Sequence, residues 1–179
     1  AEKLLDVRDI LNGQRPIFFP RNTGREPLQF YLAAILSNWT GLTHLTLKLV
    51  TATASLLTVP VVFLIGRDLV GARYGLLAAF FLAVSKWDVG IGRVGLRAPF
   101  APLFGALCLY FLLRALRYGR RNDYLLCGLV TGVGLYGYSP FRAALLLIPA
   151  ALLVKLVFER RNGWPNALNA LRNTALCLG

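Results

Sequence analysis

Long apolar stretches separated by basic residues dominate the chain from residue 45 onward. Four of them, 49–66, 98–113, 124–141 and 143–154, contain no Asp, Glu, Lys or Arg. A helix rises about 1.5 Å per residue, so about 20 apolar residues cross the roughly 30 Å hydrocarbon layer of a bilayer. The pattern therefore predicts an all-α polytopic membrane protein.

Residues 42–179 are predicted to form a transmembrane helical domain with about five spans. The expected spans lie near residues 45–66, 74–92, 98–116, 122–138 and 142–158, and another begins near residue 173. Backbone amides in lipid are satisfied only in helices or closed barrels, so we expect no β-sheet. The second span has twelve uncharged residues before Lys86, which places Lys86, Trp87 and Asp88 at or near the membrane interface.

Residues 1–41 have a different pattern, which predicts an outer-face loop with two juxtamembrane helices. Residues 1–12 carry one acidic stripe, Glu2, Asp6 and Asp9, opposite an apolar one. At about 18 Å this helix is too short to span, so it is expected to lie on the membrane surface. A second surface helix is predicted to begin at Pro27, because proline suits the first helical turn.

Composition agrees with a membrane protein. Hydrophobic residues make up 56% of the chain and the mean hydropathy is +0.58, above the roughly 45–50% apolar content of soluble domains. Lys and Arg number 20 against 8 Asp and Glu, but no basic stretch has the aromatic interleaving of a nucleic-acid module. We therefore expect membrane lipids as partners and no nucleic acid.

Cysteine and histidine give no sign of a metal or disulfide site. The three cysteines lie in apolar segments without paired spacing, and the single His44 cannot form a metal cluster alone. The chain has no Met and no signal peptide. It is interpreted as an internal fragment of a longer protein and is expected to be inactive in isolation.

Basic residues at the predicted outer ends of the spans are candidates for binding a phosphate. Arg93 and Arg97 are four residues apart, hence on one face if their segment is helical, and guanidinium offers forked donors to phosphate oxygens. Arg142 follows Tyr138 by one turn, and Lys86 lies at the end of the second span. The alternative is that these side chains snorkel to lipid headgroups.

Several strings resemble the C-type glycosyltransferase fold family, in its family-39-like branch of protein O-mannosyltransferases and the lipid A aminoarabinose transferase. EKLLDVRDILNGQRPIFFPRNTGREPLQFYLAAI resembles the first outer loop of that family. SKWDVGIGRVGLRAPFAPLF and GLYGYSPFRAALLLIP resemble spans of bacterial members. The similarity covers nearly all of the chain, with Gly24-Arg25-Glu26-Pro27-Leu28, Trp87 with Arg93, and Tyr138 with Arg142 as its best pieces.

The resemblance implies transfer of a hexose or pentose from a polyprenyl-phosphate donor to an acceptor. The enzyme would lie in the bacterial cytoplasmic membrane with its active face extracytoplasmic. The family's catalytic Asp-Glu pair would fall just upstream of Ala1, which leaves Glu2 as a weak catalytic candidate, and a divalent cation stays open as a cofactor. The residues expected to bind substrate are Arg93, Arg97, Tyr138, Arg142 and Lys86.

Two alternatives to the enzyme stay open. A transporter or flippase would place ionisable groups and broken helices near the middle of the bilayer, whereas most charges here fall at predicted span ends. A non-catalytic membrane scaffold of the same fold is the other alternative, because no catalytic carboxylate pair is visible in the chain.

The basic loop Arg114–Arg121 is predicted to face the cytoplasm. The connections on its side, at Arg67/Arg73, Arg114–Arg121 and Lys155–Arg172, carry ten Lys and Arg. The span ends of the opposite side carry five, and five further basic residues in the N-terminal segment lie on that side and even the total. An excess of basic residues in the loops between spans favours the cytoplasmic side. A cysteine placed at Asn122 should therefore resist an impermeant thiol reagent added to intact cells. Ready modification would invert the orientation.

Overall fold

The computed structural model describes residues 2–16, 18, 26–146, 148–151, 153 and 157, and these are helical or in short turns, with no β-strand among them. The helices are α1 (Glu2–Leu11), α2 (Leu28–Thr40), α3 (His44–Leu69), α4 (Ala72–Ala83), α5 (Lys86–Val94), α6 (Phe100–Tyr118), α7 (Arg121–Leu135) and the 3-10 helix η1 (Ser139–Leu146). An all-helical fold was predicted for this part of the chain.

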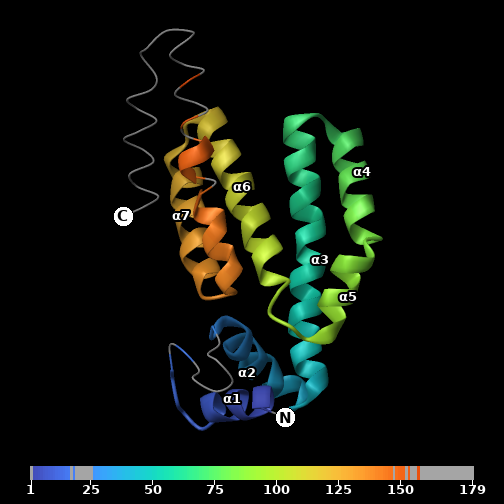
Figure 1. Cartoon of the computed structure of the whole chain (residues 1–179), viewed down its shortest axis with the longest axis vertical. Helices are drawn as coiled ribbons and strands as arrows, with labels where there is room; N and C mark the ends of the chain where they lie inside the picture. Colours follow the sequence, from blue (N-terminus) through green and yellow to red (C-terminus); the bar gives the residue numbers. More distant parts are fainter. Residues whose placement is uncertain are drawn as a thin grey trace.

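A bundle built on α3 and α6 makes up the long dimension of the molecule (Figure 1). Helix α3 packs against α2, α4, α5 and α6, and α6 packs in turn against α7. Helices α1 and α2 pack against each other at the end of the bundle where α3 begins (Figure 1). We call this the α1–α2 end, and the end where α3 and α6 finish the opposite end.

Local chemistry accounts for the boundaries of the long helices. The hydroxyl of Thr43 accepts a hydrogen bond from the Thr46 amide and so caps the start of α3. Helix α6 ends at Gly119, whose φ of 65° lies in the left-handed region that glycine tolerates best. Pro60 lies inside α3, which continues through it to Leu69.

Two helices, α3 and α6, are long and apolar enough to cross a membrane, and the α4–α5 pair is a third if it counts as one bent span. They match the predicted spans at 45–66, 98–116 and 74–92. Helix α7 covers most of the predicted span at 122–138 but has only 15 residues. Half of the predicted span beyond residue 146 and the start near 173 fall outside the described residues, so five spans stay a prediction.

The second predicted span, 74–92, is not one helix. It breaks after Ala83, and α5 runs at 51° to α4. The hydroxyl of Ser55 donates to the Asp88 carboxylate at 2.5 Å, and the hydroxyl of Thr51 donates to the Gly92 carbonyl at 2.9 Å. The sequence pattern placed Asp88 at a span end, whereas these bonds hold α5 alongside the first half of α3.

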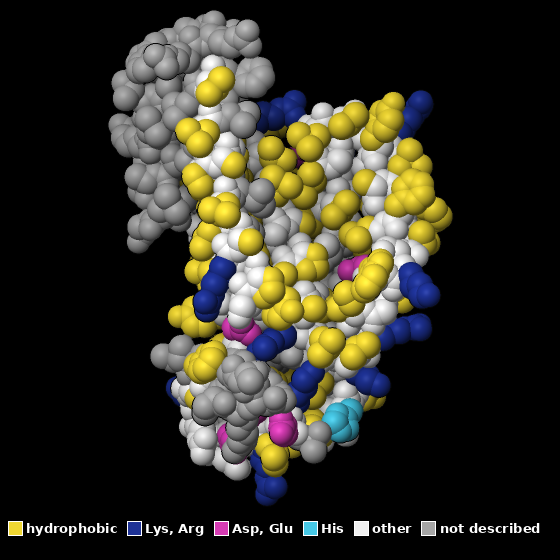
Figure 2. Space-filling view, in the orientation of Figure 1, with side chains coloured by type: hydrophobic (Ala, Val, Ile, Leu, Met, Phe, Trp, Pro, Cys, Tyr) yellow, Lys and Arg dark blue, Asp and Glu magenta, His cyan; other side chains and the backbone are white. Residues whose placement is uncertain are grey.

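Large apolar side chains remain exposed along the bundle, as Figure 2 shows over the helices above the α1–α2 end. Leu56 of α3 is 70% exposed and Phe81 of α4 is 67% exposed. Contiguous apolar surface of this extent is unusual for a soluble protein. It suits helices that face lipid, as expected of an integral membrane protein.

A close backbone-to-backbone contact joins α3 and α4 at two glycines. A Cβ atom on Gly75 would lie 2.7 Å from the Phe63 carbonyl oxygen and from the Arg67 amide nitrogen, and one on Gly66 would lie 2.7 Å from the Gly75 Cα. These neighbours are backbone atoms, which cannot move aside without shifting a helix. Small residues of this kind allow close helix packing in membranes.

We predict that Gly75→Ala lowers stability by about 1–3 kcal/mol, because the added methyl forces α3 and α4 apart. Gly105→Ala is the matched control, since a Cβ there meets nothing within 4 Å and alanine favours helix. Thermal unfolding in detergent measures both. A Gly75→Ala protein as stable as the Gly105→Ala protein would contradict the close contact.

Candidate functional site

The candidate site lies at the α1–α2 end, where four segments that are distant in the sequence meet. The segment 95–99 follows α5, and the turn 136–139 follows α7. The Leu28 amide at the start of α2 donates to the Tyr136 carbonyl at 3.2 Å. Helices α1 and α2 therefore hold both connections at this end of the bundle.

The carbonyl of Gly95 joins α1, α2 and α5. It accepts one hydrogen bond from the Lys3 ammonium at 2.8 Å and one from the Gln29 side-chain amide at 3.0 Å. Gly95 itself ends α5 with a φ of 74°, in the left-handed region. The last carbonyls of a helix lack partners within it and carry partial negative charge, so a lysine there is favourable.

A buried carboxylate, Glu26, lies beside this junction. Its side chain forms a 2.7 Å ion pair with Arg97 and accepts a hydrogen bond from the Ser139 hydroxyl. Burial raises the pKa of Glu26, but the Ser139 hydrogen bond and the charge of Arg97 favour the ionised form more strongly, so the pKa lies below its ordinary value. Glu26 is therefore an ionised link between the start of α2, the segment after α5 and the turn after α7.

Two of the predicted substrate-binding residues come together here. The guanidinium of Arg97 lies 5.9 Å from the centre of the Tyr138 ring, within cation–π range. One edge of Arg97 is already occupied by Glu26. Arg97 is thus held in place before any ligand arrives.

The other predicted residues are positioned differently. Helix α5 ends at Val94, so Arg93 and Arg97 do not share a helix face, and the expected i, i+4 pair does not form. Arg93 and Arg142 are exposed and make no ion pair or hydrogen bond to another described residue. They are available to a ligand, whereas Arg97 is partly engaged.

Lys86 begins α5, at the far end of that helix from Arg93. It lines a groove of about 540 Å³ together with Trp87, Gly90, Ile91, Val94 and Leu96. This groove is apolar apart from the lysine head, which suits a lipid chain better than a sugar. Glu2, the weak catalytic candidate, is exposed in the first turn of α1.

Sequence reasoning did not assign a site role to Glu26, Ser139, Gln29 or Lys3. Glu26 stood out only as part of the Gly24–Leu28 string that carried the family resemblance, and Ser139 only as part of the GLYGYSPFRAALLLIP string. The sequence signal that pointed to Glu26 was its place immediately before Pro27, the proline expected to start a helix. Among the residues that the structure describes, no group of three or more His, Cys, Asp or Glu could hold a metal ion.

A protein-family model described as dolichyl-phosphate-mannose-protein mannosyltransferase matches residues 23–178 of the chain. The match covers α2 and the described helices of the bundle. It also covers the residues that meet around Glu26, namely Gln29, Gly95, Arg97, Tyr138 and Ser139, whereas Lys3 precedes it. No curated protein and no solved structure gives a significant match.

Removing the charge of Glu26 should destabilise this junction. Because its pKa in the fold lies below the ordinary value of 4.5, the ionised carboxylate stabilises the fold above that pH, and the contribution is lost as the pH falls through the folded-state pKa. We predict that Glu26→Gln costs about 1–3 kcal/mol at pH 7 and progressively less in acid. Thermal unfolding over a pH series measures the difference.

The double variant Glu26→Gln/Arg97→Gln is the control for that experiment. Removing both charges leaves no unpaired guanidinium, so it should be more stable than the sum of the two single losses predicts. Strictly additive losses, or a Glu26→Gln effect that does not change with pH, would contradict the ion pair.

Proposed function

Because the chain belongs to the dolichyl-phosphate-mannose-protein mannosyltransferase family, we propose that it serves transfer of a sugar from a polyprenyl-phosphate donor to an acceptor. The family indicates a membrane glycosyltransferase, and the apolar helices agree with an integral membrane protein. The family match over residues 23–178 is the observation that carries the proposal. We place the reaction at the extracytoplasmic face of the bacterial cytoplasmic membrane, on the side of α1 and α2.

The proposed chemistry needs positive charge near the leaving phosphate. Negative charge builds on that phosphate as the glycosyl bond breaks, and fixed cations lower the barrier by stabilising it. Arg93 and Arg142 are exposed on α5 and η1 without an acidic partner among the described residues. We propose that they contact the donor phosphate, with Tyr138 presenting its ring or hydroxyl to the sugar or the isoprenoid.

Arg97 has a different part in this proposal. Its ion pair with Glu26 and its contact with Tyr138 make it a positioning residue, although a guanidinium keeps further donors for a phosphate. Lys86 faces the apolar groove along α5, and there we propose that it meets the lipid part of the donor near its phosphate.

A general base must accept a proton from the acceptor hydroxyl. Glu26 suits this role poorly, because an ion pair and a hydrogen bond keep its pKa low and occupy its oxygens. Glu2, exposed in the first turn of α1, is the candidate that we propose for this role. A divalent cation could assist, but the described residues offer no cluster of ligands for one.

Transfer can be tested directly with membranes from cells that produce the full-length protein. Polyprenyl-phosphate carrying a radiolabelled hexose or pentose is added, and label released from the lipid into acceptor or water is counted. Label released above that of control membranes supports the proposal. Lipid-linked sugar that stays intact but crosses to the other leaflet would instead support a flippase.

We predict that Arg142→Gln lowers donor use by roughly ten- to hundredfold, because a charge-assisted phosphate contact is worth about 1.5–3 kcal/mol. Arg142→Lys should lose part of the activity, since lysine keeps the charge but not the forked donors. Donor binding and transfer rate in the full-length protein measure both changes.

Arg121→Gln is the matched control, because Arg121 is equally exposed but begins α7, at the other end of that helix from η1. It should leave donor use unchanged. Unchanged donor binding in Arg142→Lys and Arg142→Gln alike would leave headgroup snorkelling as the role of Arg142 and contradict a phosphate contact.

A further inference from the structure

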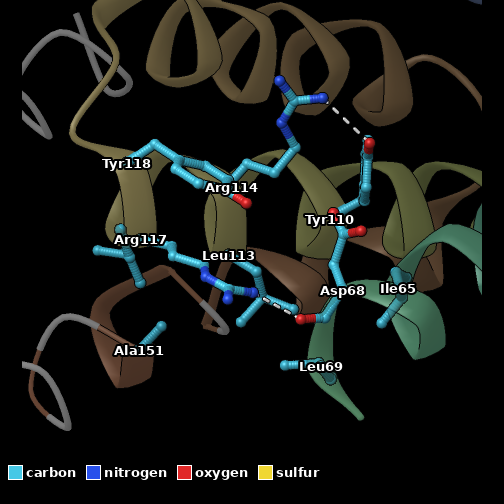
Figure 3. Close-up of a pocket in the computed structure, with 10 residues that line it drawn as sticks. Ile65, Asp68, Leu69, Tyr110, Leu113, Arg114, Arg117, Tyr118 and Ala151 are labelled. Atoms are coloured by element: carbon cyan, nitrogen blue, oxygen red, sulfur yellow. Dashed lines mark hydrogen bonds between the residues drawn. The ribbon is translucent and has the colours of Figure 1, made fainter. Parts of the chain in front are cut away.

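A pocket with an apolar wall and a polar edge lies at the opposite end of the bundle, between α3 and α6. Its volume is about 540 Å³. Its apolar wall is formed by Ile65, Leu69, Leu113, Leu116 and Ala151. Its polar edge carries Asp68, Tyr110, Arg114, Arg117 and Tyr118, several of which Figure 3 shows around the opening.

The acidic groups near this pocket already have basic partners. Arg67 forms a 2.9 Å ion pair with the Asp68 carboxylate. Arg114 lies 3.5 Å from the Asp123 carboxylate and donates to the Tyr110 hydroxyl at 3.1 Å (Figure 3). Any further arginine at the opening therefore adds positive charge that these acids do not balance.

Arg117 is such an arginine, and Arg120, which does not line the pocket itself, lies beside the same tyrosine. Their guanidinium groups lie 5.6 and 5.5 Å from the centre of the same ring, that of Tyr118. Arg117 also donates to the Asp68 carbonyl at 2.7 Å, which fixes its head at the pocket opening (Figure 3). One donor is used in that bond, and a guanidinium has five. Both positive charges lie within 5.6 Å of the centre of one ring, so an anion bound at Arg117 is attracted by Arg120 as well.

The position of the pocket identifies the kind of anion. Helices α3 and α6 are the two candidate membrane spans, and both end here, at Leu69 and Tyr118. The charged opening thus lies at a membrane interface, while the apolar wall continues toward the hydrocarbon. Basic pockets between membrane helices at such an interface suit anionic lipid headgroups.

We propose that this pocket binds an anionic phospholipid, with its phosphate at Arg117, next to Arg120, and one acyl chain along the apolar wall. A soluble phosphate would leave that wall without an occupant. The site is at the other end of the bundle from Arg142 and Glu26, so it is separate from the proposed transfer reaction.

For the test, the protein is reconstituted in nanodiscs that contain equal amounts of phosphatidylglycerol and phosphatidylcholine and is then extracted into detergent. Mass spectrometry of the lipids retained in detergent gives the enrichment of the anionic lipid. Arg117→Gln should lower this enrichment by about fivefold, from about 1 kcal/mol for one arginine at the interface. Arg73→Gln is the control, because Arg73 is exposed at the same end, in α4, but does not line the pocket. It should change the enrichment less than twofold.

Two further measurements distinguish a lipid seated in the pocket from diffuse charge attraction and from a free phosphate ion. Ala151→Phe fills the wall without changing charge and should also lower the enrichment, whereas added inorganic phosphate should not displace the lipid. Equal losses in Arg117→Gln and Arg73→Gln would mean diffuse surface attraction and overturn the proposal. Full retention in Ala151→Phe, or displacement by inorganic phosphate, would overturn it as well.

Discussion

Polar groups on α3 must find partners inside the protein, and this requirement organises the bundle. An unpaired hydroxyl or amide in an apolar environment costs several kcal/mol, by order of magnitude, so α3 can carry Thr51 and Ser55 only if they are hydrogen-bonded. Both are buried, and both reach α5, at Gly92 and Asp88. Thr51 can also donate to the Leu47 carbonyl of its own helix, whereas the hydrogen-bond partners of Ser55 lie on α5. The neighbouring helix is thereby fixed in direction and depth against α3.

The position of α5 determines the geometry of the candidate site. A Cβ on Gly92 would lie 3.1 Å from the Ser55 side chain, closer than ordinary contact, so glycine eases the close approach there. Three residues later Gly95 turns the chain in the left-handed region and presents its carbonyl to Lys3 and Gln29. Helices α1 and α2 therefore attach to a segment whose place was set by hydrogen bonds inside the bundle.

The features that follow from local pattern were predictable, and those that join distant residues were not. The lengths of α3 and α6 follow from uncharged stretches, because hydrophobic thickness acts on each segment separately. The break after Ala83 was missed, since Asp88 is stabilised by Ser55, 33 residues away. The Glu26–Ser139 hydrogen bond joins residues 113 apart, and no period or spacing in the sequence reports such a pair.

The prediction for Arg93 and Arg97 failed for a related reason. Four-residue spacing predicts a shared helix face only while the helix continues, and Gly95 ends α5 between these two arginines.

Arg97 at one end of the bundle and Arg117 at the other have their charge balanced differently, and this difference has a physical consequence. At the α1–α2 end, Arg97 is neutralised by a buried carboxylate, so the charge contributes rigidity and holds the Tyr138 ring in place. At the opposite end, Arg117 and Arg120 share a tyrosine ring, and the nearby carboxylates are paired with other arginines. The last turns of α3 and α6 carry partial negative charge, which offsets only part of this excess. An anion supplied by the membrane surface completes the balance there, so the attachment of this end depends on lipid composition, whereas the packing of the α1–α2 end depends on the protein alone.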